Sequence, residues 1–175
     1  MSDRFLAGRT ALVTGSTSGI GLGIAQSMAS AGARVAVNGL GSAEQIAQAL
    51  ASVQAAGAPD VRHFGADLSD AAAVETMMAQ IADWSPSDIV VNCAGVQHAA
   101  PLADMPAATW DKLIAINLSA AFHTMRLAMP GMAARGYGRV VNIASVHGLV
   151  ASVNKAPYVA SKFGLIGLSK VAGLE

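Results

Sequence analysis

Short apolar segments alternate with helix-length segments along the whole chain. The apolar segments are rich in β-branched residues and end at turn residues, which is typical of buried strands. Strands are expected at five places: Thr10–Thr14, Arg34–Val37, Val61–Gly65, Asp88–Asn92 and Arg139–Ile143. Helices are expected over Gly21–Ala31, Ala43–Ala55, Ala71–Trp84 and Ala107–Ala134, and from about Ala156 to the end. Strands that are apolar on both faces and alternate with helices predict an α/β fold, in which helices cover both faces of a parallel sheet.

Residues at the predicted helix ends agree with this division. Gly32 and Gly57 lie where the first and second helices are expected to stop, and Asp70 and Ser69 lie where the third is expected to be capped. Pro130 lies inside the fourth predicted helix and removes a backbone donor there. We therefore expect a kink or an early end of that helix near Arg126–Met129.

The composition is that of one globular domain. Hydrophobic residues make up 53% of the 175 residues and charged residues 13%, which provides enough apolar material for one core and too little charge for a disordered chain. Basic and acidic residues number 11 each, so no charge excess draws the chain to nucleic acid or to an anionic membrane surface. No apolar run approaches the roughly 20 residues that cross a bilayer. We therefore expect a single domain over residues 1–175 that binds neither nucleic acid nor membrane.

Cysteine content and the first residues indicate a reducing compartment. The one cysteine, Cys93, cannot form an internal disulfide. Met1–Phe5 leads into the first predicted strand without the apolar core of a signal peptide. We therefore expect a cytoplasmic location. No metal site is predicted.

A glycine-rich turn follows the first predicted strand. The chain there reads Thr14-Gly15-Ser16-Thr17-Ser18-Gly19-Ile20-Gly21, and an apolar helical pattern begins immediately afterwards. Glycines let a backbone turn sharply and approach a diphosphate, while the start of a helix supplies unpaired N–H groups and the positive end of its dipole. A loop that is merely rich in glycine is the alternative, but the position between the first strand and a helix favours a dinucleotide-binding turn.

Four residues in the second half of the chain are candidates for catalysis. Tyr158 and Lys162 are four positions apart in the last predicted helix, so they share one face of it. An ammonium group beside a phenol stabilises the phenolate and makes the tyrosine a usable general base, although an ordinary surface pair is the alternative. Ser145 follows the fifth predicted strand, at the sheet edge where open α/β folds bind ligands. Asn117 is a polar residue on an otherwise apolar helical stretch, which an internally satisfied side chain would also explain.

The turn spacing T-G-x-x-x-G-x-G, followed in order by these four residues, resembles the short-chain dehydrogenase/reductase family over nearly all of the chain. The resemblance implies a Rossmann-type, doubly wound parallel sheet in the order 3-2-1-4-5 and a nicotinamide dinucleotide as cofactor. It implies that Tyr158 removes the hydroxyl proton of the substrate during hydride transfer and that Ser145 steadies the developing carbonyl. Lys162 would tune Tyr158 and hold the nicotinamide ribose. Asn117 would position a water that passes the proton to solvent.

Two further segments resemble the cofactor-binding motifs of this family. Asn92-Cys93-Ala94-Gly95 closes the fourth predicted strand and resembles Asn-Asn-Ala-Gly, which supports the sheet and flanks the adenosine; Cys93 stands where the family usually has Asn. Asp67 follows the third predicted strand and matches the residue that contacts the adenine ring. The cofactor contacts implied by the resemblance are Gly15, Thr17, Ser18, Gly19, Ile20, Gly21, Asp67, Leu68, Asn92, Ala94, Gly95, Tyr158 and Lys162.

The choice between the two nicotinamide dinucleotides depends on the end of the second predicted strand. Val37-Asn38-Gly39-Leu40 contains neither an acidic residue that would bond the ribose hydroxyls nor a basic residue for a 2′-phosphate. Ser18 stands where relatives that prefer the phosphate often carry Arg or Lys. NAD is therefore the predicted cofactor.

Three polar residues on the same functional edge are candidates for substrate binding: Gln97, His147 and Lys155. Their amide, imidazole and ammonium donors suit a small carboxylate, although polar loop residues are more often simply solvated. His98 is expected to be a structural or solvated residue. The sequences around the three candidates resemble the bacterial D-3-hydroxybutyrate dehydrogenases within the family.

This narrower resemblance implies a reaction and a set of substrate contacts. The reaction is the oxidation of (R)-3-hydroxybutyrate by NAD, which gives acetoacetate and NADH. The implied substrate contacts are Gln97, Ser145, His147, Lys155 and Tyr158. Another small hydroxy acid or an alcohol is the alternative substrate.

Family members continue well beyond the last helix predicted here. The resemblance therefore implies that residues 1–175 lack the sixth and seventh strands of the family fold and the helices that cover the substrate. Family members are homotetramers, so a homo-oligomer is expected. A catalytically silent dinucleotide-binding fragment is the alternative from a different functional class.

Overall fold

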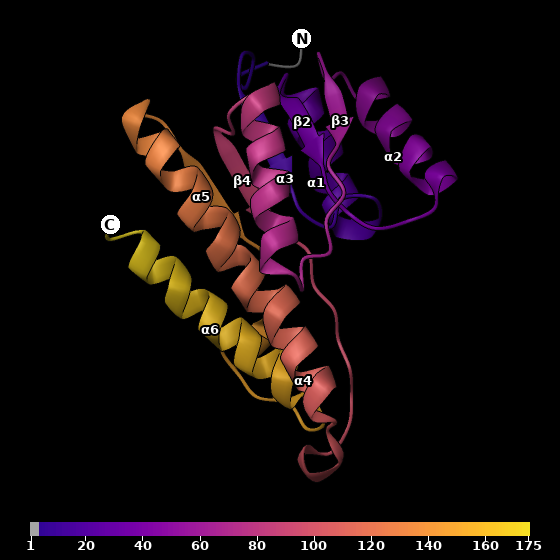
Figure 1. Cartoon of the computed structure of the whole chain (residues 1–175), viewed down its shortest axis with the longest axis vertical. Helices are drawn as coiled ribbons and strands as arrows, with labels where there is room; N and C mark the ends of the chain where they lie inside the picture. The colour runs from indigo at the N-terminus through magenta and orange to yellow at the C-terminus, as the bar shows by residue number, and fades with distance from the viewer. Residues whose placement is uncertain (1–3) are drawn as a thin grey trace.

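A five-stranded parallel sheet forms the centre of the molecule (Figure 1). The computed structural model describes residues 4–175, so the first three residues of the predicted domain, and with them part of Met1–Phe5, lie outside the described residues. The strands are β1 (Thr10–Val13), β2 (Arg34–Val37), β3 (Val61–His63), β4 (Ile89–Asn92) and β5 (Arg139–Asn142). Their order is β3-β2-β1-β4-β5, so the predicted sheet order is confirmed.

Helices cover both faces of this sheet. They are α1 (Gly19–Ser30), α2 (Ala43–Ala55), α3 (Ala71–Trp84), α4 (Ala107–Ile114), α5 (Ala120–Ala134) and α6 (Ala156–Ala172). Alternate residues of β1, β2 and β4 enter different cores, because successive side chains of a strand point to opposite faces. Val13 packs with Ala25 of α1 on one face, whereas Leu12 packs with Met77 of α3 on the other. The predicted α/β architecture is therefore confirmed.

The predicted helix boundaries are largely confirmed by the local geometry. The Asp70 carboxylate accepts a hydrogen bond from the Ala72 N–H at the start of α3, as expected of an N-cap. Gly32 and Gly57 have φ values of +96° and +113° directly after α1 and α2, a conformation that glycine adopts at little cost. None of the helices within residues 4–175 is both long and apolar enough to cross a membrane.

The long helix expected over residues 107–134 differs from the prediction. A π-helical turn, Ala115–Ser119, divides it into α4 and α5, and α5 continues through Pro130 to Ala134. The prediction that the helix ends near residues 126–129 is therefore wrong. Pro130 is exposed, so water can satisfy the carbonyl that its missing N–H leaves unpaired, and the helix need not stop.

Four of the five strands are shorter than predicted by one or two residues. β1 ends at Val13, β3 at His63 and β5 at Asn142, while β4 begins at Ile89. The residues just beyond these ends still bond to neighbouring strands: the Thr14 N–H donates to the Val91 carbonyl at 2.9 Å. Backbone pairing between the strands therefore continues beyond these ends.

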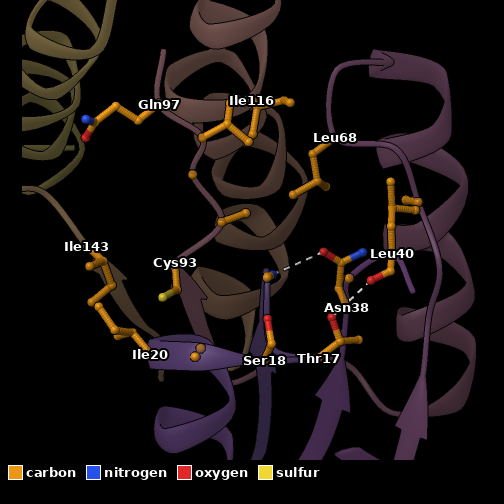
Figure 2. Close-up of a pocket in the computed structure, with 18 of the residues that line it drawn as sticks. Thr17, Ser18, Ile20, Asn38, Leu40, Leu68, Cys93, Gln97, Ile116 and Ile143 are labelled. Carbon is orange, nitrogen blue, oxygen red and sulfur yellow. Dashed lines mark hydrogen bonds between the residues drawn. The ribbon is translucent and has the colours of Figure 1, made fainter. Parts of the chain in front are cut away.

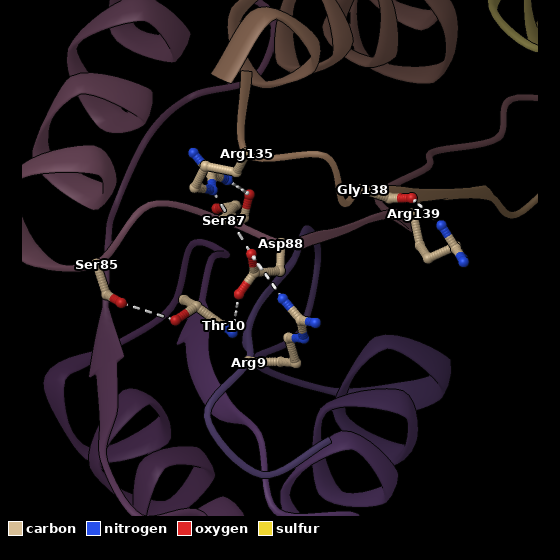
Figure 3. Close-up of polar contacts among 8 residues, drawn as sticks. All are labelled: Arg9, Thr10, Ser85, Ser87, Asp88, Arg135, Gly138 and Arg139. Atoms are coloured by element: carbon tan, nitrogen blue, oxygen red, sulfur yellow. Dashed lines mark hydrogen bonds and ion pairs between the residues drawn. The ribbon is translucent and has the colours of Figure 1, made fainter. Parts of the chain in front are cut away.

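A buried carboxylate ties three segments together at the amino ends of the strands (Figure 3). Oδ1 of Asp88 lies 3.7 Å from Nη1 of Arg9 and 3.7 Å from Nε of Arg135. Its Oδ2 accepts a hydrogen bond of 3.1 Å from the Thr10 N–H, and Nη2 of Arg135 donates to the Ser87 carbonyl at 2.7 Å. Asp88 therefore joins β1, β4 and the turn between α5 and β5.

Replacing Asp88 by alanine is expected to lower the free energy of unfolding by about 2 kcal/mol. The change leaves the buried Thr10 N–H unpaired, and this loss outweighs that of the two ion pairs because the arginine side chains are 39% and 38% exposed. Urea unfolding measures the effect. Asp83→Ala, at an exposed position of α3, is the matched control and should change stability by less than about 0.5 kcal/mol. Equal stability of the two variants would contradict this role of Asp88.

Candidate active site

A cavity of about 630 Å³ opens at the carboxyl ends of β1, β2 and β4 (Figure 2). This is the sheet edge at which open parallel α/β folds bind their ligands. Predicted site residues that line it are Gly15, Thr17, Ser18, Gly19, Ile20, Gly21, Asp67, Leu68, Ala94, Gly95, Gln97, Tyr158 and Lys162. The fold therefore brings the glycine turn, the segment after β4 and α6 to one hollow.

The glycine turn between β1 and α1 is packed too closely for side chains at two positions. A Cβ on Gly21 would lie 2.2 Å from the Gly15 carbonyl oxygen, and a Cβ on Gly15 would lie 2.8 Å from the Ala94 Cα. Gly15 also has a φ of +64°. The Ser18 side chain makes no capping bond at the start of α1, so the N–H groups of the first turn are open to an anion. The geometry is that of a cradle for a diphosphate.

Thr14 joins this turn to the segment after β4. Its Oγ1 accepts hydrogen bonds from the N–H groups of Cys93 at 3.0 Å and Ala94 at 3.1 Å. The same hydroxyl donates to the Val91 carbonyl at 3.4 Å. These bonds therefore fix the glycine turn, which follows Thr14, relative to the segment after β4, and both segments line the cavity.

One end of the cavity is formed by the end of β2 and the segment after β3. Asn38 is fully buried, and its Nδ2 donates to the Phe64 carbonyl at 3.0 Å. Asp67 accepts bonds from the hydroxyl of Ser69 at 2.7 Å and from its N–H at 2.9 Å. These bonds, the hydroxyl bond first, lower the pKa of the Asp67 carboxyl, so this end carries a negative charge at neutral pH.

Tyr158 and Lys162 lie at the other end of the cavity, on the same side of α6. Nζ of Lys162 is 5.7 Å from the centre of the Tyr158 ring and donates a 2.7 Å hydrogen bond to the Ile143 carbonyl. Burial lowers the pKa of the Lys162 ammonium, and the neighbouring Cys93 thiol opposes this shift. Burial likewise raises the pKa of the Cys93 thiol, against the effect of Lys162. An amine is thus held beside a phenol in a cavity that can contain a dinucleotide.

Ser145 and His147 lie between β5 and α6, close to Tyr158. Ser145 precedes the short 3₁₀ turn Val146–Gly148, and its Oγ accepts a 3.2 Å bond from the His147 N–H. The imidazole of His147 meets the Tyr158 ring edge-on, with 6.2 Å between ring centres. Its Nδ1 is buried and has no hydrogen-bond partner among residues 4–175. The imidazole is therefore held beside the phenol ring of Tyr158.

Asn117 is buried in the π-helical turn and is satisfied internally. Its side chain exchanges two bonds with the backbone of Val96, at 2.8 and 2.9 Å, and its Nδ2 donates to Oγ of Ser161 at 3.3 Å. A Cβ on Gly95 would lie 3.5 Å from Asn117 Oδ1 and 3.9 Å from Lys162 Nζ. Asn117 therefore lies near Lys162. Its hydrogen bonds agree equally well with the alternative to a catalytic role, in which the side chain is satisfied by bonds within the protein.

Five predicted site residues do not line the cavity: Asn92, Asn117, Ser145, His147 and Lys155. Asn92 is buried behind the wall, where Nδ2 donates to Oδ1 of Asn142 at 2.8 Å and Oδ1 accepts from Thr124 at 2.7 Å, so it fits the sheet-supporting role better than a cofactor contact. Lys155 precedes α6 and does not line the cavity. His98 is exposed and also lies outside it.

Residues that line the cavity but were not predicted as contacts are Asn38, Gly39, Leu40, Ala66, Cys93, Val96, Ile116, Ile143 and Ala144, although the sequence assigns the segments of the first three and of Cys93 to the cofactor site. Most are apolar or small and carry no chemical signal in a single sequence. Asn38 is the exception, because a polar residue at the end of a buried strand at this sheet edge is itself a signal.

Comparison with known proteins agrees with this geometry. The chain is 53% identical to the D-beta-hydroxybutyrate dehydrogenase of Cupriavidus necator, over 97% of the chain and 66% of that protein. It is 47% identical to the D-beta-hydroxybutyrate dehydrogenase of Rhizobium meliloti, over 95% of the chain and 65% of that protein. The chain thus spans about two thirds of the length of these curated relatives.

A solved structure and a family model complete the comparison. A metagenomic short-chain oxidoreductase in complex with NADP superposes with a TM-score of 0.90 at 37% identity, covering 95% of the chain and 75% of that structure. The model of the family described as short chain dehydrogenase matches residues 9–175. This chain therefore belongs to the short-chain dehydrogenase family.

Proposed function

We propose that the chain is the dinucleotide-binding and catalytic portion of a 3-hydroxybutyrate dehydrogenase. The reaction is (R)-3-hydroxybutyrate plus NAD giving acetoacetate, NADH and a proton. One observation carries the proposal: Tyr158 and Lys162 line one end of a cavity whose middle is the glycine cradle. The similarity to D-beta-hydroxybutyrate dehydrogenases supports the choice of substrate.

The residues around the cavity fit a nicotinamide dinucleotide. The cradle has no room for a Cβ at Gly15 or Gly21, which leaves main-chain N–H groups to meet a diphosphate. Among the described lining residues, the charged ones are Asp67 and Lys162, so no lining residue beside Asp67 is a cation, and Lys112 acts on Asp67 from outside the lining. This supports NAD over NADP. When bound, the dinucleotide accepts the hydride that leaves the substrate carbon.

The side chains at the tyrosine end perform the proton chemistry. Tyr158 takes the proton of the substrate hydroxyl, and Ser145 donates a hydrogen bond to the same oxygen as it becomes a carbonyl. The Lys162 ammonium favours the phenolate and holds the nicotinamide ribose. Asn117, next to Lys162, positions the water that returns the proton to solvent.

The substrate carboxylate is held by Gln97, His147 and Lys155. The position of His147 supports this role, because its imidazole lies edge-on to the Tyr158 ring, with 6.2 Å between ring centres. Gln97 lines the cavity, and Lys155 stands directly before α6. With the carboxylate held in this way, Tyr158 near the start of α6 would face the hydroxyl end of the substrate.

The carboxylate assignment predicts the kinetics of two variants. In active enzyme, His147→Ala and Lys155→Ala are each expected to raise the KM for 3-hydroxybutyrate about tenfold or more, because each removes a charged or hydrogen-bonded contact that is made in both ground and transition state. Steady-state assays of NADH formation measure this effect. His98→Ala is the matched control and should leave KM unchanged. An unchanged KM in both variants would refute the assignment.

A second candidate function is dinucleotide binding without turnover, favoured by the observation that the glycine turn lines the cavity whereas Lys155 lies outside the lining. Purified residues 1–175 are tested for NADH binding by fluorescence and for reduction of NAD and NADP with a panel of hydroxy acids and alcohols. NADH binding with turnover of 3-hydroxybutyrate is expected under the first proposal. Binding without turnover of any substrate would favour the second. Turnover of a different alcohol would keep the reaction type and replace the substrate.

A further inference from the structure

Thr17 fills the space that a side chain at position 39 would need. A Cβ built on Gly39 would lie 2.4 Å from Oγ1 of Thr17, 2.9 Å from its Cγ2 and 3.2 Å from its Cβ. The two γ atoms are both too close, so turning the threonine about χ1 exchanges one obstacle for the other. A side chain at position 39 is therefore incompatible with the threonine in place.

The backbone of Gly39 does not by itself require glycine. Its φ lies outside the left-handed region, unlike that of Gly15 or Gly19 in the turn. No atom other than those of Thr17 is among the three nearest to the added Cβ. The glycine at position 39 is consequently a steric partner of Thr17.

Two bonds fix the end of β2 in this arrangement. Oγ1 of Thr17 donates to the Leu40 carbonyl at 3.2 Å, a bond drawn in Figure 2. From the other side, Nε2 of His63 at the end of β3 bonds the Gly39 carbonyl at 2.8 Å. With the glycine turn on one side and β3 on the other, residues 39 and 40 cannot easily move away from Thr17.

Position 39 lies two residues beyond the end of β2, where the cavity would meet the adenosine half of a dinucleotide laid across the cradle. In dinucleotide-binding folds this is where an acidic residue bonds the ribose 2′-hydroxyl, or where an arginine accommodates a 2′-phosphate. Here the position carries no side chain, and the described lining residues nearby offer the carboxylate of Asp67 and the apolar side chain of Leu40.

We propose that Thr17 is a specificity-determining residue for the dinucleotide: it keeps position 39 free of any side chain and so withholds the cation that a 2′-phosphate needs. The inference rests on the proposed function, because it presumes that a nicotinamide dinucleotide occupies the cavity. Replacing Thr17 by alanine removes the two γ atoms at 2.4 and 2.9 Å and leaves only its Cβ at 3.2 Å, so an arginine at position 39 then requires only a small shift. Thr17 in the glycine turn, together with the end of β2, thus determines the preference for NAD over NADP.

Binding of NADH and NADPH to four proteins tests this inference by fluorescence titration: the wild type, Gly39→Arg, Thr17→Ala, and Thr17→Ala/Gly39→Arg. The wild type is expected to bind NADH more tightly than NADPH. Gly39→Arg alone is expected to weaken NADH binding about tenfold, because the new side chain displaces Thr17 or the end of β2. The double variant is expected to bind NADPH about tenfold more tightly than Gly39→Arg does, through arginine–phosphate bonds.

A matched control separates the position of the new charge from the charge itself. Gly23 is an exposed helical glycine of α1, and a Cβ built there meets no atom within 4 Å. Gly23→Arg should leave both dinucleotide affinities unchanged within about twofold. If it improves NADPH binding as much as the double variant does, general electrostatic attraction explains the gain and the inference fails.

The remaining outcomes are also decisive. Equal NADPH affinity of Gly39→Arg and the double variant would overturn the role of Thr17 while leaving the proposed function intact. A wild type that binds neither dinucleotide would overturn the proposed function and this inference with it. If the arginine variants do not fold, the alanine pair decides: Gly39→Ala should weaken NADH binding, and Thr17→Ala/Gly39→Ala should restore it. Absence of that restoration would overturn the inference.

Discussion

A Tyr158→Phe variant in active enzyme is expected to lose turnover by about 10³-fold while it binds NADH as tightly as the wild type. The substitution removes only the phenolic hydroxyl, so the ring keeps its contact with His147 and its place beside Lys162. Without that hydroxyl, no group in the proposed mechanism takes the proton of the substrate. Steady-state rates of NADH formation and fluorescence titration with NADH measure the two halves of this expectation.

Tyr137→Phe is the matched control for this variant. Tyr137 lies at the amino ends of the strands, where its ring stacks against the Arg9 guanidinium at 3.6 Å, at the opposite edge of the sheet from the cavity that Tyr158 lines. The control should retain wild-type turnover. Retained turnover in Tyr158→Phe, or an equal loss in both variants, would refute the assignment of Tyr158 as the base.

A Gly21→Ala variant is expected to lose dinucleotide binding by about 10²-fold and stability by about 3 kcal/mol. The added Cβ would lie 2.2 and 2.7 Å from the carbonyl oxygen and carbon of Gly15 and 3.0 Å from the Ser16 Cα. All three atoms belong to the backbone, so no side chain can rotate out of the way. The turn must open instead, which displaces the N–H groups that would meet the diphosphate.

Gly23→Ala is the control for this effect, since it lies two positions further along the same helix in open space. It should keep dinucleotide affinity and raise stability by about 0.5 kcal/mol, because alanine has a higher helix propensity than glycine. Thermal unfolding and NADH titration compare the two variants. Similar behaviour of both would show that the close contact between Gly21 and Gly15 has no functional consequence.

The sheet could be predicted from the sequence because its signals are local and repeated. Apolar residues such as Leu12 and Val13 pack into the two cores on opposite faces of the sheet. Gly32 and Gly57 lie directly after α1 and α2 and end these helices. The π-helical turn at Ala115–Ser119 could not be predicted, because it alters hydrogen bonding without altering the apolar pattern. The predicted early end of the helix near Pro130 was wrong for a similar reason. The cost of the backbone hydrogen bond lost at a proline depends on how exposed the proline is, and a single sequence does not show this.

The candidate site shows the same division between local and tertiary information. The glycine turn and the Tyr158–Lys162 pair are visible as spacings, and the fold places them in one cavity. Other contacts join elements that are distant in sequence, so the spacing of residues does not predict them. Examples are the bond from Lys162 to the Ile143 carbonyl and the contact between Thr17 and Gly39. The roles of the individual residues, the preference for NAD, the homo-oligomer and the cytoplasmic location stay predictions.

The position of β1 at the middle of the sheet governs when the phosphate cradle can form. β1 gains β2 as a neighbour early, but its other neighbour is β4, and the bond from Thr10 to Asp88 spans 78 positions. The close approach of Gly15 to Ala94 therefore requires that the ribosome has already added the segment after β4. Until then the chain lacks the segment that packs against Gly15, so the binding site is incomplete.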